Sequence, residues 1–309
     1  MLNKELVELR KSELLYYSPF NFLREIESEV LLEPIMQDLQ LWQQTGKLLF
    51  EFQGVQFFYT YLSWDSAFFG KKTGKLNYVL FQGNLDNLVR ACRRFVQQLS
   101  NDAFDYLFTE IPSEDILLIQ ALNVAGLKSS ETRLVYFHDQ VQQFTSERFD
   151  VRPATDKDIP NLRNVAIKMR NRFDRFHADP CIEQDAGDSF LAKYVEEGVK
   201  GYNDVVLVPA ESGLPSDSFF SLNLMEKDWR KLGTNVSKIV LTAASSDTNR
   251  GWHYKLLVES LHWLKSKGSE VVYMPTQSTN RAVIRNCEKA GFKYGGSSHV
   301  LTCDLASKS

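Results

Sequence analysis

Hydrophobic and polar residues follow two different periods along the chain. Residues 1–48 place Leu, Ile and Phe among charges at helical spacing, which predicts two or three short helices, with Pro19 and Pro34 as start or break points. From Lys47 the pattern becomes aromatic and β-branched, which is typical of strands, and Gly54 marks a turn. Helices are then predicted at 85–99 and 113–126, and strands at 75–81, 104–111 and 134–137.

A second α/β unit is predicted from Asp150 onward. Residues 151–153 form a short strand, and Thr155 to Asp158 have the form of a capping box that opens a helix over 159–173. Further helices are predicted at 189–201, 254–268 and 280–291, and strands at 204–210, 219–225, 238–244, 270–276 and 300–305.

The ends of the two units resemble each other. A shift of 165 residues superimposes residues 106–137 on 271–302 without a gap, and both segments are predicted as strand, helix, glycine stop and strand. Identical residues recur at six aligned positions, among them Ser113 with Ser278 and Gly126 with Gly291. We interpret this as an internal duplication. The alternative is two unrelated α/β segments that share a helix-stop glycine.

Composition and charge narrow the class of protein. The 309 residues are 43% hydrophobic and 24% charged, which is typical of a folded globular chain. Lys and Arg number 36 against 39 Asp and Glu, so the net charge of −3 gives no general attraction to nucleic acid or to an anionic membrane. No apolar run reaches the roughly 18 residues of a membrane span, and the first residues do not resemble a secretory signal. We expect a cytoplasmic protein.

The cysteines give no sign of a metal site. Cys92, Cys181, Cys287 and Cys303 are dispersed, without the CxxC or Cys/His spacing of zinc ligands. We therefore expect reduced thiols and no metal.

The most specific motif lies at residues 280–294. It resembles the final motif of the GNAT superfamily of acyl-CoA-dependent N-acyltransferases, in which an Asn opens a helix that ends in E-K-x-G-F. The matching residues are Asn280, Ile284, Glu288, Lys289, Gly291 and Phe292. The resemblance implies an α/β fold with a mixed central sheet flanked by helices, and acetyl-CoA as co-substrate. The alternative is a capped helix on a sheet without a ligand.

The preceding residues resemble the GNAT loop that binds the CoA pyrophosphate. Arg250 and Gly251 match the start of that loop, but His253 and Lys255 stand where the family has glycines. Either their side chains replace close backbone approach with positive charge, or pyrophosphate binding is weakened or lost. The residues that the resemblance assigns to the cofactor are Leu241, Ala243, Ala244, Arg250, Gly251, Trp252, His253, Tyr254, Lys255 and Asn280.

In most GNAT enzymes a tyrosine of this helix is the general acid. In this sequence Cys287 stands at that position. A thiol can donate a proton to the departing CoA thiolate, so Cys287 is one candidate acid, and the alternative is a small buried cysteine. Tyr294 is a second candidate donor. A covalent acyl-cysteine is disfavoured, because a primary amine held at the thioester attacks directly.

Residues 62–76 and 170–201 narrow the resemblance. They are similar to the dTDP-fucosamine acetyltransferases, which N-acetylate dTDP-4-amino-4,6-dideoxygalactose. The resemblance implies three parts: a helical extension over 1–48, an incomplete GNAT-like N-terminal domain over 49–145, and a GNAT acyltransferase domain over 149–309. The WDSAFFG sequence within 62–76 has no assigned role, and the alternative is an aromatic turn that fills the core.

Basic residues after the first helix of the second unit form a candidate acceptor lid. Guanidinium groups suit phosphate oxygens, so we assign binding of the nucleotide diphosphate to Arg170, Arg172, Arg175 and His177, with Lys168 nearby. A solvated basic helix end is the alternative. His177 and Glu226 are candidate bases for the acceptor ammonium, although each also fits a structural role.

The sequence therefore predicts an N-acetyltransferase that transfers an acetyl group from acetyl-CoA to a nucleotide-linked amino sugar used in surface polysaccharide synthesis. Its expected partner is this small-molecule acceptor, not nucleic acid or membrane, and a homodimer stays open. Two alternatives remain: a non-catalytic GNAT-like binding module, and an enzyme acting on a peptide or small-metabolite amine.

Overall fold

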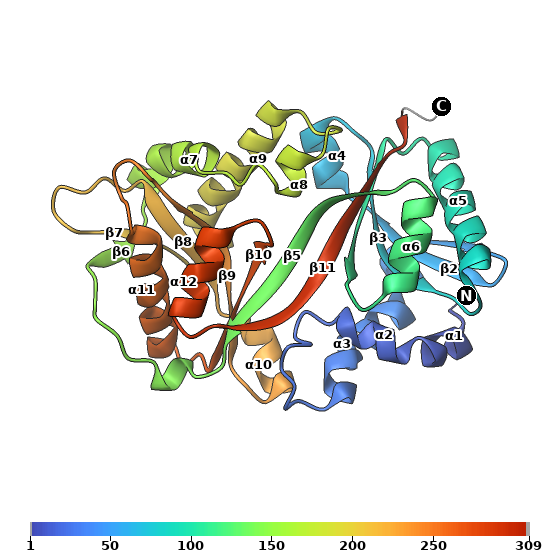
Figure 1. Cartoon of the computed structure of the whole chain (residues 1–309), viewed down its shortest axis with the longest axis horizontal. Coiled ribbons are helices and arrows are strands. Elements are labelled where there is room, and N and C mark those ends of the chain that lie inside the picture. Colours follow the sequence, from blue (N-terminus) through green and yellow to red (C-terminus); the bar gives the residue numbers. More distant parts are fainter. Residues whose placement is uncertain (1, 307–309) are drawn as a thin grey trace. The chain divides into compact units, whose positions relative to one another are not determined.

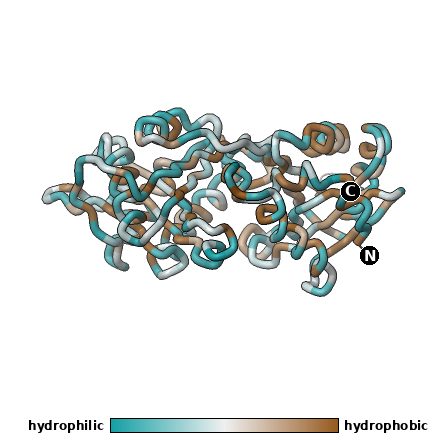
Figure 2. The backbone as a smooth tube through the Cα atoms, turned by 90° about the horizontal axis from the view of Figure 1, so that it is seen from below, coloured by the Kyte–Doolittle hydropathy of each residue, from teal (hydrophilic) through white to brown (hydrophobic). Residues whose placement is uncertain are grey.

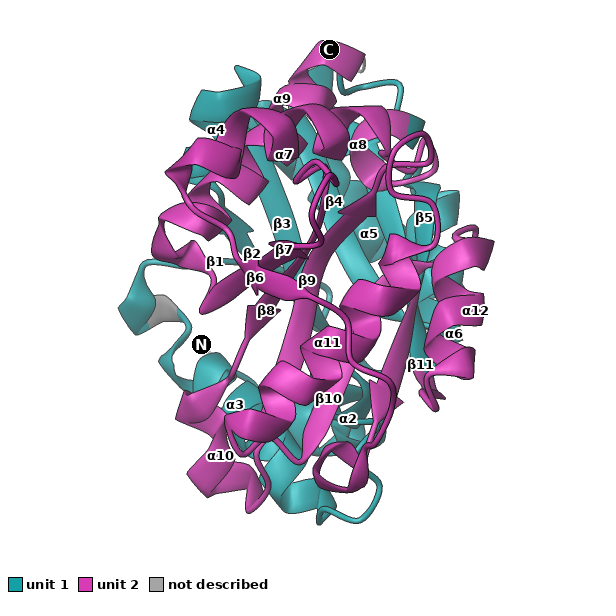
Figure 3. Ribbon diagram, turned by 90° about the vertical axis from the view of Figure 1, so that its left-hand side faces the viewer, with its two compact units in different colours: residues 1–133, 178–182, 296–309 teal, residues 134–177, 183–295 magenta. Residues whose placement is uncertain are grey.

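The computed structural model describes residues 2–306, and its chain forms two compact units. Unit 1 comprises residues 1–133, 178–182 and 296–309, and unit 2 comprises 134–177 and 183–295 (Figure 3). Hydrophobic and hydrophilic residues are interspersed along the described backbone (Figure 2). The units do not coincide with the predicted divisions at 48, 145 and 149, because short segments late in the sequence complete unit 1.

Unit 1 is built on a mixed sheet (Figure 1). Its strands are β1 (Leu48–Phe52), β2 (Val55–Tyr61), β3 (Thr73–Leu80), β4 (Tyr106–Pro112), the first part of β5 (Lys128–His138) and the second part of β11 (Lys293–Asp304). β1, β2 and β3 pair antiparallel, β3 and β4 pair parallel, and β11 pairs antiparallel with β4. Between β2 and β5, the chain forms the helices α4 (Ser63–Phe69), α5 (Leu85–Asn101) and α6 (Ile116–Val124).

Helices cover both faces of this sheet. Phe57 belongs to the core shared with α5 and α6, whereas its neighbour Phe58 packs against the N-terminal helices, as the two-residue period of a strand requires. Those helices are α1 (Lys4–Leu9), α2 (Lys11–Tyr16), α3 (Ser28–Leu41) and the short 3-10 turn Gln43–Thr45. The predicted helices in residues 1–48 are confirmed, and they form one layer of unit 1.

Unit 2 repeats this arrangement. Its strand order is β5 (Lys128–His138), β10 (Val271–Gln277), β9 (Val236–Ala244), β8 (Ser218–Asn223), β7 (Val205–Pro209) and β6 (Val151–Pro153). One face packs on α11 (Trp252–Ser266) and α12 (Arg281–Lys289), and the other on α7 (Ile159–Lys168) and α9 (Gln184–Glu197). The mixed α/β fold with helices on both faces of the sheet is thus confirmed.

The internal repeat is visible in the element bounds. β4 and β10 begin at residues 106 and 271, α6 and α12 at 116 and 281, and β5 and β11 at 128 and 293, so a shift of 165 residues relates all three pairs. A register shift also interrupts the pairing of β2 with β3 and of β8 with β9. The final strands are exchanged between the repeats, because β11 pairs with β4 and β5 neighbours β10.

Several elements differ from the sequence-based prediction. The helix expected over 159–173 ends at Lys168, Pro34 lies inside α3, and residues 63–69 form a helix instead of a turn. Two short helices were not predicted, α8 (Arg175–Ala178) and α10 (Glu226–Leu232). Strands β5 and β11 are longer than expected, because each continues from one unit into the other.

The smaller elements of unit 2 are the 3-10 turns Val141–Gln143 and Asp156–Asp158 and a π-helical turn, Gly198–Tyr202. The capping box is confirmed: the Thr155 backbone N–H donates to the Asp158 carboxylate at 2.8 Å. Within residues 2–306 no helix is long and apolar enough to cross a membrane.

Candidate functional site

The two central strands of unit 2 pair only at one end. β9 and β10 run parallel, and their register covers residues 236–238 of β9 and 271–273 of β10. Beyond these three pairs, residues 239–244 of β9 are paired on their other side alone, with β8. The backbone groups of this half of β9 that face β10 are therefore available to an extended ligand.

A bulge lies in the same half of β9. Phe220 pairs with Thr242 and Leu222 with Ile239, so two residues of β9, Val240 and Leu241, face a single residue of β8. A bulge leaves an extra residue out of the ladder and turns its backbone groups away from the regular direction. Residues 239–244, which we call the unpaired half of β9 because they lack a partner on the β10 side, thus carry backbone amides near Leu241 that make no hydrogen bond within the sheet.

The loop between β9 and α11 is held rigidly on the side of β8. The buried Asn249 side chain donates to the Pro215 carbonyl at 3.0 Å and to the Ser218 hydroxyl at 3.1 Å. The Ser245 backbone N–H donates to the Asp217 carbonyl at 3.2 Å. These contacts fix the direction in which the loop enters α11.

The loop ends at an open helix N-terminus. Gly251 precedes α11 with φ 89°, a conformation that favours glycine, and no side chain caps the helix there. A Cβ at Gly251 would meet no atom within 4 Å, so the space above this backbone is free. Arg250 is exposed and has no polar partner among the described residues. The Trp252 N–H donates to the Asn249 carbonyl at 3.0 Å, so the amides that remain for a ligand are those of the next residues in the first turn. Together with the helix dipole and the Arg250 guanidinium, they favour an anion.

His253 does not supply a positive charge to this loop. Its Nε2 lies 3.4 Å from the Thr242 hydroxyl, and its Nδ1 accepts from the Asn286 side-chain amide at 3.0 Å. Burial lowers the pKa of His253 to about 4, so the ring is neutral near pH 7. The interpretation of His253 as a cationic replacement for glycine is therefore wrong, because the ring faces inward and joins α11 to β9 and α12.

Lys255 is also engaged within the protein. Its ammonium lies 3.1 Å from the Glu211 carboxylate and 4.6 Å from the centre of the Trp252 ring. Tyr254, the residue before it, lies under the Lys289 ammonium at 3.8 Å, and Trp252 is buried. Of the three basic residues expected to act in this loop, Arg250 is the one that is exposed and that has no ion-pair partner in the part of the chain that the structure describes.

The GNAT-like motif at 280–294 forms the predicted helix. Asn280 is the N-cap of α12, and its side chain accepts from the Val283 backbone N–H at 3.5 Å. Cys287 is fully buried, with Sγ 3.8 Å from the Met274 Sδ, and burial raises the pKa of its thiol to about 12. These surroundings favour the packing interpretation of Cys287 over its role as an acid.

Tyr294 lies at the start of β11 and is 53% exposed. Its ring packs against Tyr136, with 6.3 Å between the ring centres, and Tyr136 donates to the Glu288 carboxylate at 3.1 Å. Sequence reasoning missed Tyr136, because its position in β5 predicts an ordinary core residue.

Glu226 opens α10 instead of ending the strand before it, and it is exposed. It lies three residues beyond Asn223, which pairs with Lys238 at the paired end of β9. Glu226 is thus placed by the ladder at the opposite end of β9 from the open loop, which does not favour a role as base.

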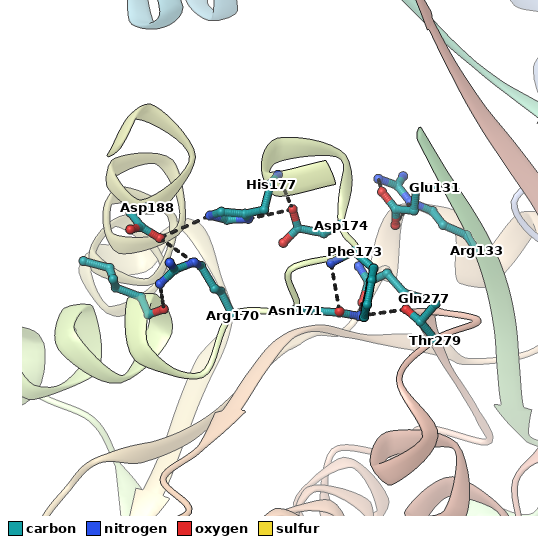
Figure 4. A network of polar contacts seen from close by, with 11 residues as sticks. Glu131, Arg133, Arg170, Asn171, Phe173, Asp174, His177, Asp188, Gln277 and Thr279 are labelled. Carbon is teal, nitrogen blue, oxygen red and sulfur yellow. Dashed lines mark hydrogen bonds and ion pairs between the residues drawn. The ribbon is translucent and has the colours of Figure 1, made fainter. Parts of the chain in front are cut away.

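The four residues of the predicted lid have different environments, and Figure 4 shows two of them, Arg170 and His177. The Arg170 Nε lies 3.1 Å from the Asp188 carboxylate, and Arg175 is buried with its guanidinium 4.5 Å from the centre of the Phe176 ring. Arg172 is exposed and has no polar partner among residues 2–306. Lys168, in the same stretch, pairs with Asp247 at 2.6 Å.

His177 is clamped between two carboxylates. Its Nδ1 lies 2.8 Å from Asp174 and its Nε2 lies 3.1 Å from Asp188, with the side chain 2% exposed (Figure 4). Burial alone lowers the pKa of His177, but the hydrogen bonds with the two aspartates raise it overall. Because both ring nitrogens already contact carboxylates, neither is free to take a proton from an acceptor amine, so the proposed role of His177 as base is not supported.

The corresponding region of unit 1 is closed by its own side chains. Asn84 caps α5 by accepting from the Asn87 backbone N–H at 3.1 Å. Asp115 is the residue that a shift of 165 aligns with Asn280, and it is buried. Its carboxylate accepts hydrogen bonds from the Arg10 guanidinium at 2.5 Å and from the Tyr17 hydroxyl at 2.8 Å. The pairing of β3 with β4 also stops after four residue pairs, although β3 continues to Leu80. The strand edge thus opens in both units, and the uncapped helix N-terminus that follows it is the feature of unit 2.

Comparison with known proteins supports the fold. No protein-family model and no curated protein matches the sequence. A GCN5-related N-acetyltransferase from Sphaerobacter thermophilus matches with a TM-score of 0.53 and 12% identity, over 89% of this chain and 85% of its own. A functionally unknown conserved protein from Staphylococcus epidermidis matches with a TM-score of 0.52 and 11% identity, over 82% of this chain and 92% of its own.

A third neighbour is the GCN5-related glucosamine N-acetyltransferase region of a fungal multi-domain β-N-acetylglucosaminidase. It has a TM-score of 0.54 and 13% identity, and the match covers 81% of this chain and 31% of the fungal one. The chain therefore has the fold of the GNAT N-acetyltransferases. None of these three structures is described as a dTDP-fucosamine acetyltransferase.

Proposed function

We propose that the protein is an acyl-CoA-dependent N-acetyltransferase whose cofactor site lies on unit 2. The observation that carries this proposal is the parting of β9 and β10 after three residue pairs, followed directly by the uncapped N-terminus of α11. Acetyl-CoA fits both parts: its pantetheine amides pair with a free strand edge, and its pyrophosphate suits open backbone amides beside Arg250. Acetyl-CoA supplies the activated acetyl group.

The reaction proceeds by direct transfer. The neutral amine of the acceptor attacks the thioester carbonyl, a C–N bond forms as the C–S bond breaks, the amine proton passes to solvent, and CoA leaves as a thiolate that is then protonated. Backbone amides of the free half of β9, near the bulge at Leu241 and at Ala243 or Ala244, stabilise the negative charge that develops on the carbonyl oxygen.

The acceptor that we propose is the amine of a nucleotide-linked amino sugar. Arg172 supports this choice, because it is an exposed guanidinium on the segment that follows α7, and it has no polar partner within residues 2–306. A dTDP-4-amino-4,6-dideoxyhexose is the specific candidate, on the resemblance of residues 62–76 and 170–201. A cytoplasmic location and action on surface polysaccharide precursors belong to the same proposal.

Acetyl-CoA should bind to the protein, and reversal of the charge at Arg250 should weaken that binding. We expect Arg250→Glu to raise the dissociation constant at least tenfold, because an exposed carboxylate would repel the pyrophosphate at the helix N-terminus. Isothermal calorimetry with acetyl-CoA measures this directly. Arg230→Glu is the matched control, because Arg230 is an exposed residue of α10, which follows β8 near the other end of β9.

Two results would contradict the proposal. An absence of heat with millimolar acetyl-CoA would remove the cofactor site, and an equal loss of affinity in both charge-reversal variants would show a general effect of charge. Binding without turnover on any amine would instead favour the alternative of a non-catalytic GNAT-like module. That alternative is supported by the neutral His253, the paired Lys255 and the buried Cys287.

Cys287 should not be required for catalysis. Its buried thiol, with a pKa near 12, is a poor proton donor at neutral pH, so we expect Cys287→Ala to keep kcat within about twofold of the parent. Steady-state turnover with the best acceptor measures this. Tyr294→Phe is the matched test of the second donor, because it removes a single exposed hydroxyl. A tenfold fall in kcat for Cys287→Ala, with Tyr294→Phe unaffected, would restore the thiol as the acid.

A further inference from the structure

The residues after α7 form a turn that is tied to the end of β10. The Asn171 side-chain amide donates to the Gln277 side-chain oxygen at 3.2 Å and lies 3.3 Å from the Thr279 hydroxyl (Figure 4). Its side-chain oxygen accepts from the Phe173 backbone N–H at 3.1 Å. One asparagine thus fixes the turn and attaches it to the strand whose other end pairs with β9.

A second set of contacts fixes the far side of the turn. Asp174 accepts from both the backbone N–H and the ring Nδ1 of His177, and His177 contacts Asp188 with its other nitrogen. Asp188 in turn holds Arg170, which lies just before the turn. Residues 171–173 are therefore held between two anchored points.

The two residues between these anchors are exposed. Phe173 is 54% exposed, and Arg172 is exposed as well. Among residues 2–306, Phe173 has no aromatic partner and Arg172 has no polar partner. Most of the other basic residues in the stretch are engaged: Lys168, Arg170 and His177 form ion pairs, and Arg175 lies against an aromatic ring. An apolar ring held in water on a rigid turn gains free energy when a ligand covers it.

We propose that Arg172 and Phe173 form the acceptor-recognition element of the enzyme, and that its ligand is the nucleoside diphosphate part of the acceptor. This inference rests on the proposed function. A guanidinium fork binds phosphate oxygens, and an exposed aromatic ring stacks on a nucleobase. Because Asn171 ties the turn to Gln277, a nucleotide held there leaves the amine of its sugar free to reach the unpaired half of β9.

The probes are dTDP and UDP, which carry the diphosphate and the base but no amine. Calorimetric titration of the full-length protein should show binding of at least one of them. We expect Arg172→Ala and Phe173→Ala each to raise its dissociation constant about tenfold or more, and Phe173→Tyr to keep it within about threefold because the ring remains. Affinity for acetyl-CoA should stay unchanged in all three variants.

Arg230→Ala is the matched control for charge, because Arg230 is an exposed arginine on α10. In turnover with an amino-sugar nucleotide, Arg172→Ala and Phe173→Ala should raise KM more than they lower kcat, because they remove binding of a part of the acceptor that does not react.

The outcomes separate the two proposals. Binding of acetyl-CoA without binding of either nucleotide would overturn the recognition element and leave the acetyltransferase standing. Nucleotide binding that Arg172→Ala and Phe173→Ala do not change would also overturn the role of the turn. Turn-dependent nucleotide binding without acetyl-CoA binding would support the recognition element and contradict the proposed function.

Discussion

Replacement of Arg10 with methionine should lower the free energy of unfolding by about 3–5 kcal/mol. Arg10 belongs to unit 1, whereas the candidate functional site belongs to unit 2. The Arg10 guanidinium and the Asp115 carboxylate lie 2.5 Å apart, with side chains 9% and 1% exposed. Methionine keeps much of the length of the side chain and its contact with the Phe81 ring, but it leaves Asp115 charged and buried. The Tyr17 hydroxyl remains as a single neutral donor.

Urea unfolding measures this loss as a fall in the midpoint at an unchanged slope. The double variant Arg10→Met with Asp115→Asn should recover most of the stability, because it removes both charges and Tyr17 can still donate to the amide oxygen. A loss below about 1 kcal/mol in the single variant would show that the pair is not buried in solution. If the effects of Arg10→Met and Asp115→Asn on the free energy of unfolding simply added in the double variant, the two side chains would not interact.

The protein should lose stability as the pH falls from about 6.5 to about 4, and His253 should be the main cause. Burial lowers the pKa of His253 to about 4 in the folded state, whereas an unfolded histidine has a pKa near 6.5. The unfolded state therefore binds a proton first as the pH falls. The contribution of neutral His253 to the free energy of unfolding is fully present above pH 6.5. It falls by about 3 kcal/mol in total as the pH is lowered to 4.

His253→Gln should remove most of this pH dependence, because an amide can replace the contacts with Thr242 and Asn286 without titrating. A weaker dependence should remain, since burial also lowers the pKa of His138 and His262. The measurement is the free energy of unfolding in urea at pH 4, 5, 6 and 7. An unchanged slope in His253→Gln would contradict the assignment.

His177 provides the control with the opposite sign. Its pKa is raised by its aspartate partners, so its stabilisation is fully present below about pH 6.5 and is lost as the pH rises through the raised value. His177→Gln should therefore lower stability near neutral pH while the dependence between pH 4 and 6.5 persists.

The local elements of the fold could largely be predicted from the sequence. α12 begins after the N-cap Asn280 and the chain leaves it at Gly291 with φ 89°, because these residues satisfy the helix ends through contacts within a few positions. The repeat could be predicted for the same reason: strand, helix and strand recur at a fixed spacing whatever surrounds them.

The exchange of the final strands could not be predicted. β5 and β11 have the hydrophobic pattern of strands in either unit, and pattern alone does not select a partner. Similarly, the period of residues 159–173 is helical, but the Asn171 side chain makes hydrogen bonds with Gln277 and Thr279 and the helix ends at Lys168.

In the candidate site, too, some features follow from the local sequence and others from the tertiary structure. The sequence by itself determined the order of strand, loop and helix in unit 2, the N-cap of α12, and the glycine before α11, because each depends on backbone preferences of neighbouring residues. Tertiary structure decided which charges are available. In the sequence, six basic residues of these segments look equivalent: Arg170, Arg172, His177, Arg250, His253 and Lys255. In the folded chain, burial keeps His253 neutral, and carboxylates pair with Lys255, Arg170 and His177. Arg172 and Arg250 are left exposed.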